Sequence, residues 1–202
     1  MLVRRLDFIA IGPQRTGSTW LDESLRASEF ITLPDAAKET FFFDEGYSKG
    51  FDWYWSHFPN SRNICIGEVA PSYFDVGECV DRVAAHNPDC KIIATLRNPA
   101  ERSYSLYLHH LRKGRVPADF RAAVELMPRI VTSSHYAEHL RRWGSRFGES
   151  NLLVLRQEDI EDNFRRRSES FSNSKIFSAM PFASPTSTNR PNFPFCKISS
   201  GP

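Results

Sequence analysis

The sequence lacks several features that assign a chain to a specialised class of protein. No apolar run approaches the roughly 20 residues needed to span a bilayer, so we expect no membrane span. The first strand-like stretch begins by about Leu6 and leaves no room for a signal peptide, so the chain as given is expected to be cytoplasmic. A net charge of +2, from 26 basic and 24 acidic residues, argues against a non-specific nucleic-acid binder.

Cysteine is scarce and scattered. Cys65, Cys79, Cys90 and Cys196 show no Cys-x-x-Cys or Cys/His spacing. We therefore expect reduced thiols rather than a metal site or a disulfide framework.

The overall composition is that of an ordinary globular protein. With 202 residues, of which 41% are hydrophobic and 25% charged, the chain suits one domain with a sizeable core. From about residue 165, Ser, Asn, Pro and isolated Phe replace any sustained periodicity. We expect a folded domain over 1–164 and an irregular or disordered tail over 165–202.

The first strand-like stretch predicts a phosphate-binding loop. Phe8 to Ile11 form a continuous apolar run, typical of a strand covered on both faces. Gly12 and Gly17 then allow a sharp turn and close approach to an anion. Ser18 or Thr19 can cap a following helix, whose N–H groups and positive dipole end would face the loop. The expected ligand is a phosphate.

The rest of the chain alternates between strand-like and helix-like patterns. We expect strands at 30–33, 63–68, 91–97 and 151–156, and helices at about 76–86, 99–113, 119–126 and from 133 or 134 to 147. This alternation predicts an α/β fold with a parallel central sheet flanked by helices on both faces. Ligands of such sheets collect beyond the carboxyl ends of the strands, where the first loop and residues 97–105 both fall.

The helix after Asn98-Pro99 is expected to have two different sides. Asn98 suits the N-cap and Pro99 the first helical position. The expected packing side comprises Ala100, Tyr104, Tyr107 or Leu108, and Leu111, and the expected solvent or ligand side comprises Arg102, Ser105, His109 and Arg112.

A second cluster of interest precedes residue 45. Phe41 to Phe43 form an aromatic run that we expect to be buried, holding Lys38 and Glu39 at the edge of a cleft.

The loop departs from the nucleoside triphosphatase pattern G-x-x-x-x-G-K-[ST]. Ser18 stands where the phosphate-neutralising lysine belongs. Arg15 is the cation inside the loop, and its planar guanidinium suits a terminal oxyanion. No acidic magnesium partner is evident after a second strand, so an ordinary ATPase or GTPase is disfavoured.

Six motifs together resemble a known family. Residues 12–21 (GPQRTGSTWL) resemble the 5′-phosphosulfate loop of sulfotransferases that use 3′-phosphoadenosine 5′-phosphosulfate (PAPS), and residues 96–107 resemble their 3′-phosphate motif. Residues 38–44, 49–54, 68–74 and 154–160 are similar to further landmarks of the branch that contains heparan sulfate sulfotransferases and many bacterial relatives.

The resemblance implies a P-loop nucleoside triphosphate hydrolase-like fold and sulfonate transfer from PAPS, without a metal, to a hydroxyl or amine of a glycan or small-molecule acceptor. It implies Glu39 as the base that removes the acceptor's proton, with Arg15 as a second catalytic group, and Lys38 and Tyr73 as acceptor-binding residues. The donor-binding residues that it implies are Gly12, Arg15, Thr16, Gly17, Ser18, Thr19, Trp20, Arg97 and Ser105, with Arg102 as a further candidate for the 3′-phosphate.

Three departures from the family pattern bear on activity. Arg15 replaces a lysine found in many relatives, and Val69 replaces a lysine that would help bind an anionic glycan. The basic, glycine-containing loop that covers the nucleotide is not found after Asp159. One hypothesis is a tail produced by truncation or frameshift, with a weakened or inactive domain. Another is that Arg165 to Arg167 substitute for the loop.

Several alternatives stay open at this point. A nucleoside or small-molecule kinase would bind ATP with magnesium, and a nucleotide-binding remnant would bind without turnover. Locally, Glu39 could pair with Lys38 on the surface. Arg97 and Ser105 could be a strand-end salt bridge and a helix-surface hydroxyl. The identity of the acceptor and the oligomeric state are not predicted.

Overall fold

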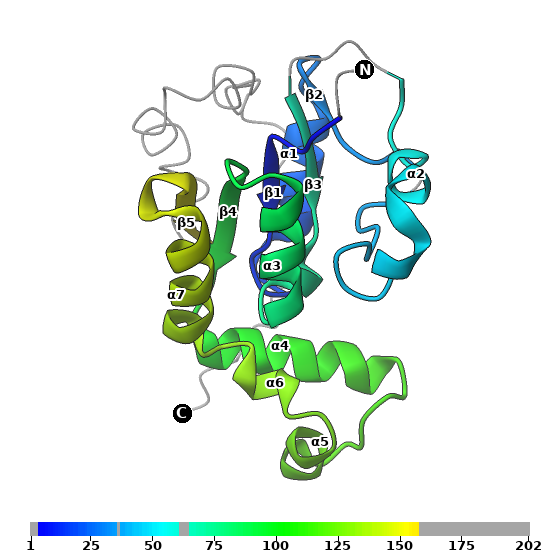
Figure 1. Ribbon diagram of the computed structural model, residues 1–202. Helices are drawn as coiled ribbons and strands as arrows, with labels where there is room; N and C mark the ends of the chain where they lie inside the picture. Colours follow the sequence, from blue (N-terminus) through cyan, green and yellow to red (C-terminus); the bar gives the residue numbers. More distant parts are fainter. Residues whose placement is uncertain (1–3, 36, 61–64, 158–202) are drawn as a thin grey trace, which may run out of the picture.

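A five-stranded parallel sheet lies at the centre of the computed structural model, which describes residues 4–35, 37–60 and 65–157 (Figure 1). The strands are β1 (Phe8–Ala10), β2 (Ile31–Thr32), β3 (Cys65–Val69), β4 (Lys91–Leu96) and β5 (Leu152–Arg156), in the order β2-β3-β1-β4-β5. The pairings of β1 with β3 and β4, of β2 with β3 and of β4 with β5 are parallel. The predicted parallel α/β sheet is confirmed.

Helices cover both faces of the sheet and its carboxyl edge. Figure 1 shows α1 (Ser18–Arg26) behind the sheet, α3 (Gly77–His86) and α7 (Tyr136–Phe147) in front of it, and α4 (Pro99–Arg112) beyond the end of β4. The remaining elements are the short helices α2 (Gly50–Trp55), α5 (Phe120–Leu126) and α6 (Arg129–Thr132), and the 3-10 turns η1 (Tyr47–Lys49), η2 (Pro71–Tyr73) and η3 (Glu149–Asn151).

The apolar run of β1 is continuous because both of its faces are buried. Phe8 and Ala10 belong to the cluster that contains Leu25 of α1. Ile9 lies on the opposite face, in the larger cluster that contains Trp143 of α7. A strand with this double burial has no solvent face, so it shows no polar alternation.

Two helix starts differ from the expectation. Gly17, with φ of 94°, is the N-cap of α1, and no side chain of the described residues caps that helix. The last helix begins at Tyr136 rather than at Ser133 or Ser134, and the short α6 before it was not predicted. The Ser133 hydroxyl does not cap a helix, because it donates to Asp75 Oδ2 at 2.7 Å.

The two sides of α4 are only in part those that the hydrophobic pattern predicts. Tyr107 is buried as expected, but Arg102 is fully buried rather than facing solvent, and Tyr104 is 55% exposed. A terminal nitrogen of Arg102 donates to Ile130 O at 2.5 Å. Its Nε donates to Ser134 Oγ, in the segment between α6 and α7, at 2.6 Å. The prediction for Arg102 was wrong because two nitrogens of this buried cation form hydrogen bonds to α6 and to the segment after it, which the sequence does not reveal.

Within the aromatic run, Phe42 and Phe43 are fully buried as expected, but Phe41 is 42% exposed and has a positive φ of 55°. The Phe42 ring stacks on Tyr54, with ring centroids 4.5 Å apart. This left-handed conformation at a bulky residue turns one ring outward between anchored neighbours.

Two predictions from composition can be compared with the structure. Cys65, Cys79 and Cys90 are free and buried, in agreement with reduced thiols, and Cys196 lies outside the described residues. Among the described residues, no helix is both long and apolar enough to cross a membrane.

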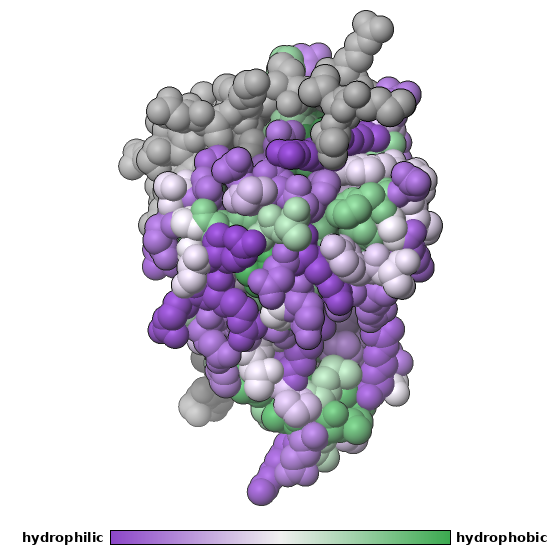
Figure 2. Space-filling view, viewed as in Figure 1, coloured by the Kyte–Doolittle hydropathy of each residue, from purple (hydrophilic) through white to green (hydrophobic). Residues whose placement is uncertain are grey.

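The surface over α3 and α7 is mostly hydrophilic, and more hydrophobic surface lies near the lower end of the molecule, where Figure 1 places α5 (Figure 2). Tyr104, Phe120 and Leu126, from α4 and α5, are among the exposed large hydrophobic residues. A small separate cluster that includes Tyr107 and Ile130 lies beneath them.

We expect Gly12→Ala to destabilise the fold strongly. A Cβ at this position would lie 2.2 Å from Thr95 Oγ1 and 2.4 Å from the Thr95 backbone nitrogen. The backbone of β4 cannot move aside cheaply, so the expected loss of unfolding free energy is about 3 kcal/mol or more. Gly77→Ala is the matched control, because its nearest heavy atom is the flexible Arg142 end at 3.5 Å. Equal melting temperatures for the two variants would contradict this account.

Candidate active site

The loop between β1 and α1 is fixed from below by Thr16. This residue is fully buried, and its hydroxyl donates to Pro13 O at 2.7 Å and shares a hydrogen bond with Thr95 Oγ1, also at 2.7 Å. Thr95 belongs to β4, so the loop rests on the neighbouring strand. The Thr16 hydroxyl therefore has a structural role, and the part of Thr16 in donor binding stays a prediction. Gly12 is needed for the close contact with Thr95, and its contact with an anion stays a prediction.

The two predicted anion motifs meet at Arg15 and Ser105. The Arg15 side chain points outward from a left-handed backbone, with φ of 76°. Its Nε donates to Ser105 Oγ of α4 at 3.1 Å, although 90 residues separate the two. Partial burial, together with the charges of Arg112 and Arg97, lowers the pKa of Arg15. Three guanidinium groups that repel one another in this way favour an anionic ligand.

Arg97 lies at the same edge but is engaged by a carboxylate. Its Nε and a terminal nitrogen donate to Glu101 Oε2 at 3.1 and 3.0 Å. Glu101 is largely exposed, and this i,i+4 pair lies at the end of β4 and the start of α4. The salt bridge that the sequence left open as an alternative is thus present, and a phosphate at Arg97 has to compete with Glu101.

Lys38 lies at the start of the helix that follows the first loop. Its Nζ donates to Ser18 Oγ at 2.8 Å and to Thr19 Oγ1 at 3.4 Å. Burial lowers the pKa of Lys38, and the nearby carboxylates of Glu39 and Asp22 partly oppose that shift. The cation missing at position 18 is therefore supplied from a segment 20 residues further along the chain. The assignment of Lys38 to the acceptor stays a prediction.

Glu39 is directly beside this cation and is half-buried. Its Oε2 accepts a hydrogen bond from the Ser72 backbone nitrogen at 3.3 Å. Burial raises the pKa of Glu39, and Ser72, Lys38 and Arg129 oppose the shift. A carboxylate with a raised pKa is a stronger base than an exposed one. The alternative of a surface pair with Lys38 therefore does not describe Glu39 fully, because the carboxylate is partly buried and also accepts a hydrogen bond from Ser72.

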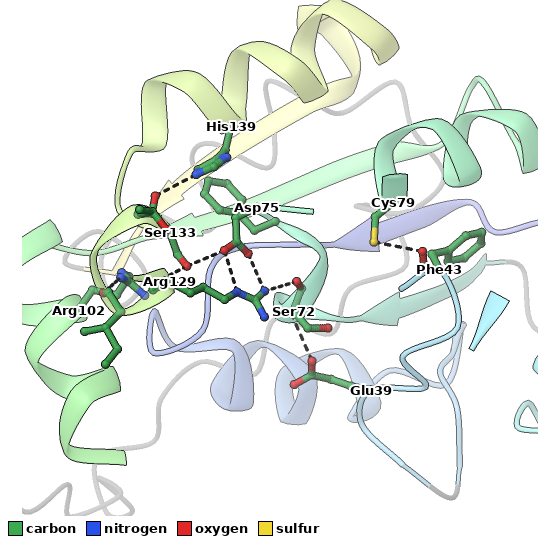
Figure 3. Close-up of polar contacts among 12 residues, drawn as sticks. Glu39, Phe43, Ser72, Asp75, Cys79, Arg102, Arg129, Ser133 and His139 are labelled. Carbon is green, nitrogen blue, oxygen red and sulfur yellow. Dashed lines mark hydrogen bonds and ion pairs between the residues drawn. The ribbon is translucent and has the colours of Figure 1, made fainter. Parts of the chain in front are cut away.

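A polar network on the far side of Ser72 was not predicted (Figure 3). Arg129 of α6 donates to Ser72 O at 2.6 Å and to both Asp75 oxygens at 2.6 and 2.7 Å. Burial disfavours the charged Asp75 carboxylate, but Arg129 and Ser133 outweigh it, so the pKa of Asp75 is lowered. The network ties α6 to the turn that contacts Glu39. No sequence motif marks Arg129, since its partners lie more than 50 residues away.

Two further predicted site residues are not placed to touch a ligand. Tyr73 is fully buried, and its hydroxyl lies 3.4 Å from both Glu68 Oε1 and Thr40 Oγ1. We correct its assignment to the acceptor, because its ring has no exposed surface. Arg102 of α4 is likewise fully buried and is not available to a 3′-phosphate. Trp20 is partly buried against the α1 side of the sheet, and its role in donor binding stays a prediction.

The described residues thus gather cations and the carboxylate of Glu39 at the carboxyl edge of the sheet. Arg15 and Lys38 lie at the start of α1, where the helix dipole adds positive potential, and Glu39 follows Lys38. This set suits the transfer of an anionic group from a phosphate leaving group to a nucleophile that loses a proton to Glu39.

Comparisons with known proteins identify the family of this chain. A family model described as "Sulfotransferase domain" matches residues 5–172. The chain is 30% identical over 208 residues to a human bifunctional heparan sulfate N-deacetylase/N-sulfotransferase 2, covering 91% of this chain and 23% of that protein. It is 32% identical over 178 residues to the Bos taurus protein of the same name, covering 77% of this chain and 20% of that protein. The chain spans about a fifth of the length of these curated relatives.

Solved structures share the fold. A sulfotransferase from Alicyclobacillus acidocaldarius superposes with a TM-score of 0.73 at 24% identity, covering 88% of this chain and 82% of that chain. A mouse sulfotransferase complexed with PAP superposes with a TM-score of 0.61 at 17% identity, covering 90% of this chain and 62% of that chain.

We expect Glu101→Gln to strengthen the binding of adenosine 3′,5′-bisphosphate about 3- to 10-fold, because loss of the carboxylate frees Arg97 for a phosphate. Isothermal titration calorimetry measures the change. Glu125→Gln is the matched control, since Glu125 forms the same i,i+4 pair with Arg121 on the exposed side of α5. Unchanged or weaker binding by Glu101→Gln would remove Arg97 from the donor site.

Proposed function

The chain belongs to the sulfotransferase domain family, and from that premise we propose that it moves a sulfonate group from PAPS to a hydroxyl or amine of a glycan or small-molecule acceptor. The observation that carries the proposal is the contact between Arg15 of the first loop and Ser105 of α4. It brings together a loop suited to a phosphosulfate and a helix suited to a second phosphate.

The described side chains fit such a donor by charge. Arg15, Lys38 and the N-terminal turn of α1 would hold the phosphosulfate. Arg97 and Ser105 would hold the 3′-phosphate, which distinguishes this donor from ATP. The mutual repulsion that lowers the pKa of Arg15 is relieved by a ligand with two anionic ends.

Glu39 is the proposed base. As it takes a proton from the acceptor's hydroxyl or amine, the acceptor oxygen or nitrogen forms a bond to sulfur, and the bond from sulfur to the phosphate oxygen breaks. Negative charge develops on the departing phosphate, where Arg15 and Lys38 stabilise it. Lys38 is adjacent to Glu39 and is hydrogen-bonded to Ser18. One short segment therefore carries both the base for the acceptor and a cation for the departing phosphate.

The acceptor is proposed to be a glycan on the strength of the relatives, whose names include heparan sulfate. Val69, in place of a lysine, leaves small-molecule acceptors equally compatible with the site.

The cytoplasmic location, the absence of a nucleic-acid partner and the domain end at 164 stay predictions. The hypotheses about the tail concern residues that lie outside those described.

Calorimetry separates this proposal from a kinase. We expect adenosine 3′,5′-bisphosphate to bind at least about 10-fold more tightly than ATP with magnesium, because Arg97 and Ser105 recognise the additional phosphate. A preference for ATP with magnesium would defeat the proposal. Transfer of labelled sulfate from PAPS to an N-deacetylated heparan oligosaccharide or to p-nitrophenol then separates an enzyme from a nucleotide-binding remnant.

Replacement of Glu39 tests the base. We expect Glu39→Gln to lower the turnover number by about 10²- to 10⁴-fold, with bisphosphate affinity changed less than about threefold. Glu45→Gln is the control, an exposed carboxylate in the same segment. The active form of Glu39 is the carboxylate, and its pKa is raised above the ordinary glutamate value of 4.5. As the pH is lowered, the activity of the wild type should therefore begin to fall while the pH is still above 4.5. Turnover by Glu39→Gln at the wild-type rate would exclude Glu39 as the base.

A further inference from the structure

Glu68 is a carboxylate in the core that the reaction outlined above does not use. It lies in β3 and is fully buried. Its Oε1 accepts hydrogen bonds from the Thr40 backbone nitrogen and the Thr40 hydroxyl, both at 2.7 Å. Its Oε2 accepts one from the Tyr54 hydroxyl at 2.9 Å. Isolated charges are rarely tolerated at such depth, so this carboxylate depends on these donors.

The hydrogen bonds to Glu68 organise the segment that follows Glu39. Three amides of this segment, those of Thr40, Phe42 and Phe43, donate to side-chain oxygens rather than pairing as in a helix or a strand. The Thr40 nitrogen donates to Glu68, the Phe42 nitrogen to Thr40 Oγ1 at 3.2 Å, and the Phe43 nitrogen to the Tyr73 hydroxyl at 3.3 Å. The acceptors are therefore Glu68 itself or hydroxyls within hydrogen-bonding distance of it.

The backbone between these anchors is strained. Phe41 has φ of 55°, a conformation that costs a bulky residue free energy and persists where its neighbours are held firmly. Thr40 on one side is bonded to Glu68, and Phe42 on the other is fully buried. Glu39 immediately precedes this fixed stretch, so the direction of its side chain depends on the same anchors.

We propose that Glu68 is the positioning residue of the active site: through Thr40, its carboxylate holds the backbone that carries Glu39 against the Ser72 amide. This inference rests on the proposed function, in which Glu39 is the base. Glu68 itself touches neither donor nor acceptor. Burial raises the pKa of Glu68, against the effect of the Thr40 and Tyr54 hydrogen bonds, so its ionisation also depends on this segment being in place.

Two substitutions of Glu68 separate positioning from bulk stability. Glu68→Leu removes the acceptor for Thr40, and we expect the turnover number to fall about 100-fold or more, with bisphosphate affinity changed less than threefold. Glu68→Gln keeps a carbonyl oxygen for Thr40 and should retain turnover within about tenfold. Leu153→Ala, a core change on β5, is the stability control and should lower the melting temperature without lowering turnover of the folded protein.

Hydrogen exchange gives a readout that does not require activity. The Thr40, Phe42 and Phe43 amides should be protected in the wild type and in Glu68→Gln, and should exchange faster in Glu68→Leu. If Glu68→Leu does not fold, Thr40→Val serves instead, because it removes one bond to Glu68 and the acceptor for the Phe42 amide. Its expected effect on turnover is smaller, about 3- to 10-fold.

The outcomes distinguish this inference from the proposed function. Unchanged exchange of the three amides in Glu68→Leu overturns the inference, whatever the activity. Faster exchange with wild-type turnover, in a protein that Glu39→Gln inactivates, also overturns it. If the wild type transfers no sulfate, or Glu39→Gln remains active, the proposed function or its base is wrong, and the exchange data alone then decide whether Glu68 holds the segment.

Discussion

The contact between the first loop and Thr95 sets the geometry on which the candidate active site depends. Gly12 has no side chain, so the loop descends onto β4 closely enough for the Thr16 and Thr95 hydroxyls to share a hydrogen bond. With Thr16 turned inward, Arg15 projects from the opposite side of the loop. The helix that carries Ser105 begins where β4 ends, so the same contact sets the distance between Arg15 and Ser105.

The positive charges at this edge of the sheet are unfavourable for the stability of the ligand-free protein. Arg15 is close enough to Arg97 and Arg112 for their charges to lower its pKa, and Lys38 also lies at the loop, with its pKa lowered mainly by burial. Like charges in a partly buried site destabilise the protein unless they are compensated. Hydroxyls and the exposed Glu101 provide only part of that compensation. A site of this kind is typical of a protein that binds a strongly anionic ligand, in agreement with membership in the sulfotransferase domain family.

The proposed base is supported from two directions by elements that belong to different parts of the chain. Its own segment is bonded through Thr40 to the buried Glu68 of β3. The turn that donates to Glu39 is bonded in turn to Arg129 of α6, which is itself paired with Asp75. A carboxylate between two rigid supports loses little side-chain freedom when the acceptor arrives, and such preorganisation is what proton transfer in a defined geometry requires.

The sequence alone determined the parallel sheet and the helix that starts at Asn98-Pro99, because continuous apolar runs and caps are local signals. The second of the two anion motifs was predicted from its resemblance to a family. Only the tertiary structure decided that Lys38 reaches Ser18, that Arg102 is buried and that Glu68 holds Thr40. Each of these depends on which side chains meet after the chain has crossed between elements. A charged residue looks the same in a sequence whether its partner is water or a donor from a distant element, and the hydrogen bonds that make its burial possible exist only in the folded protein.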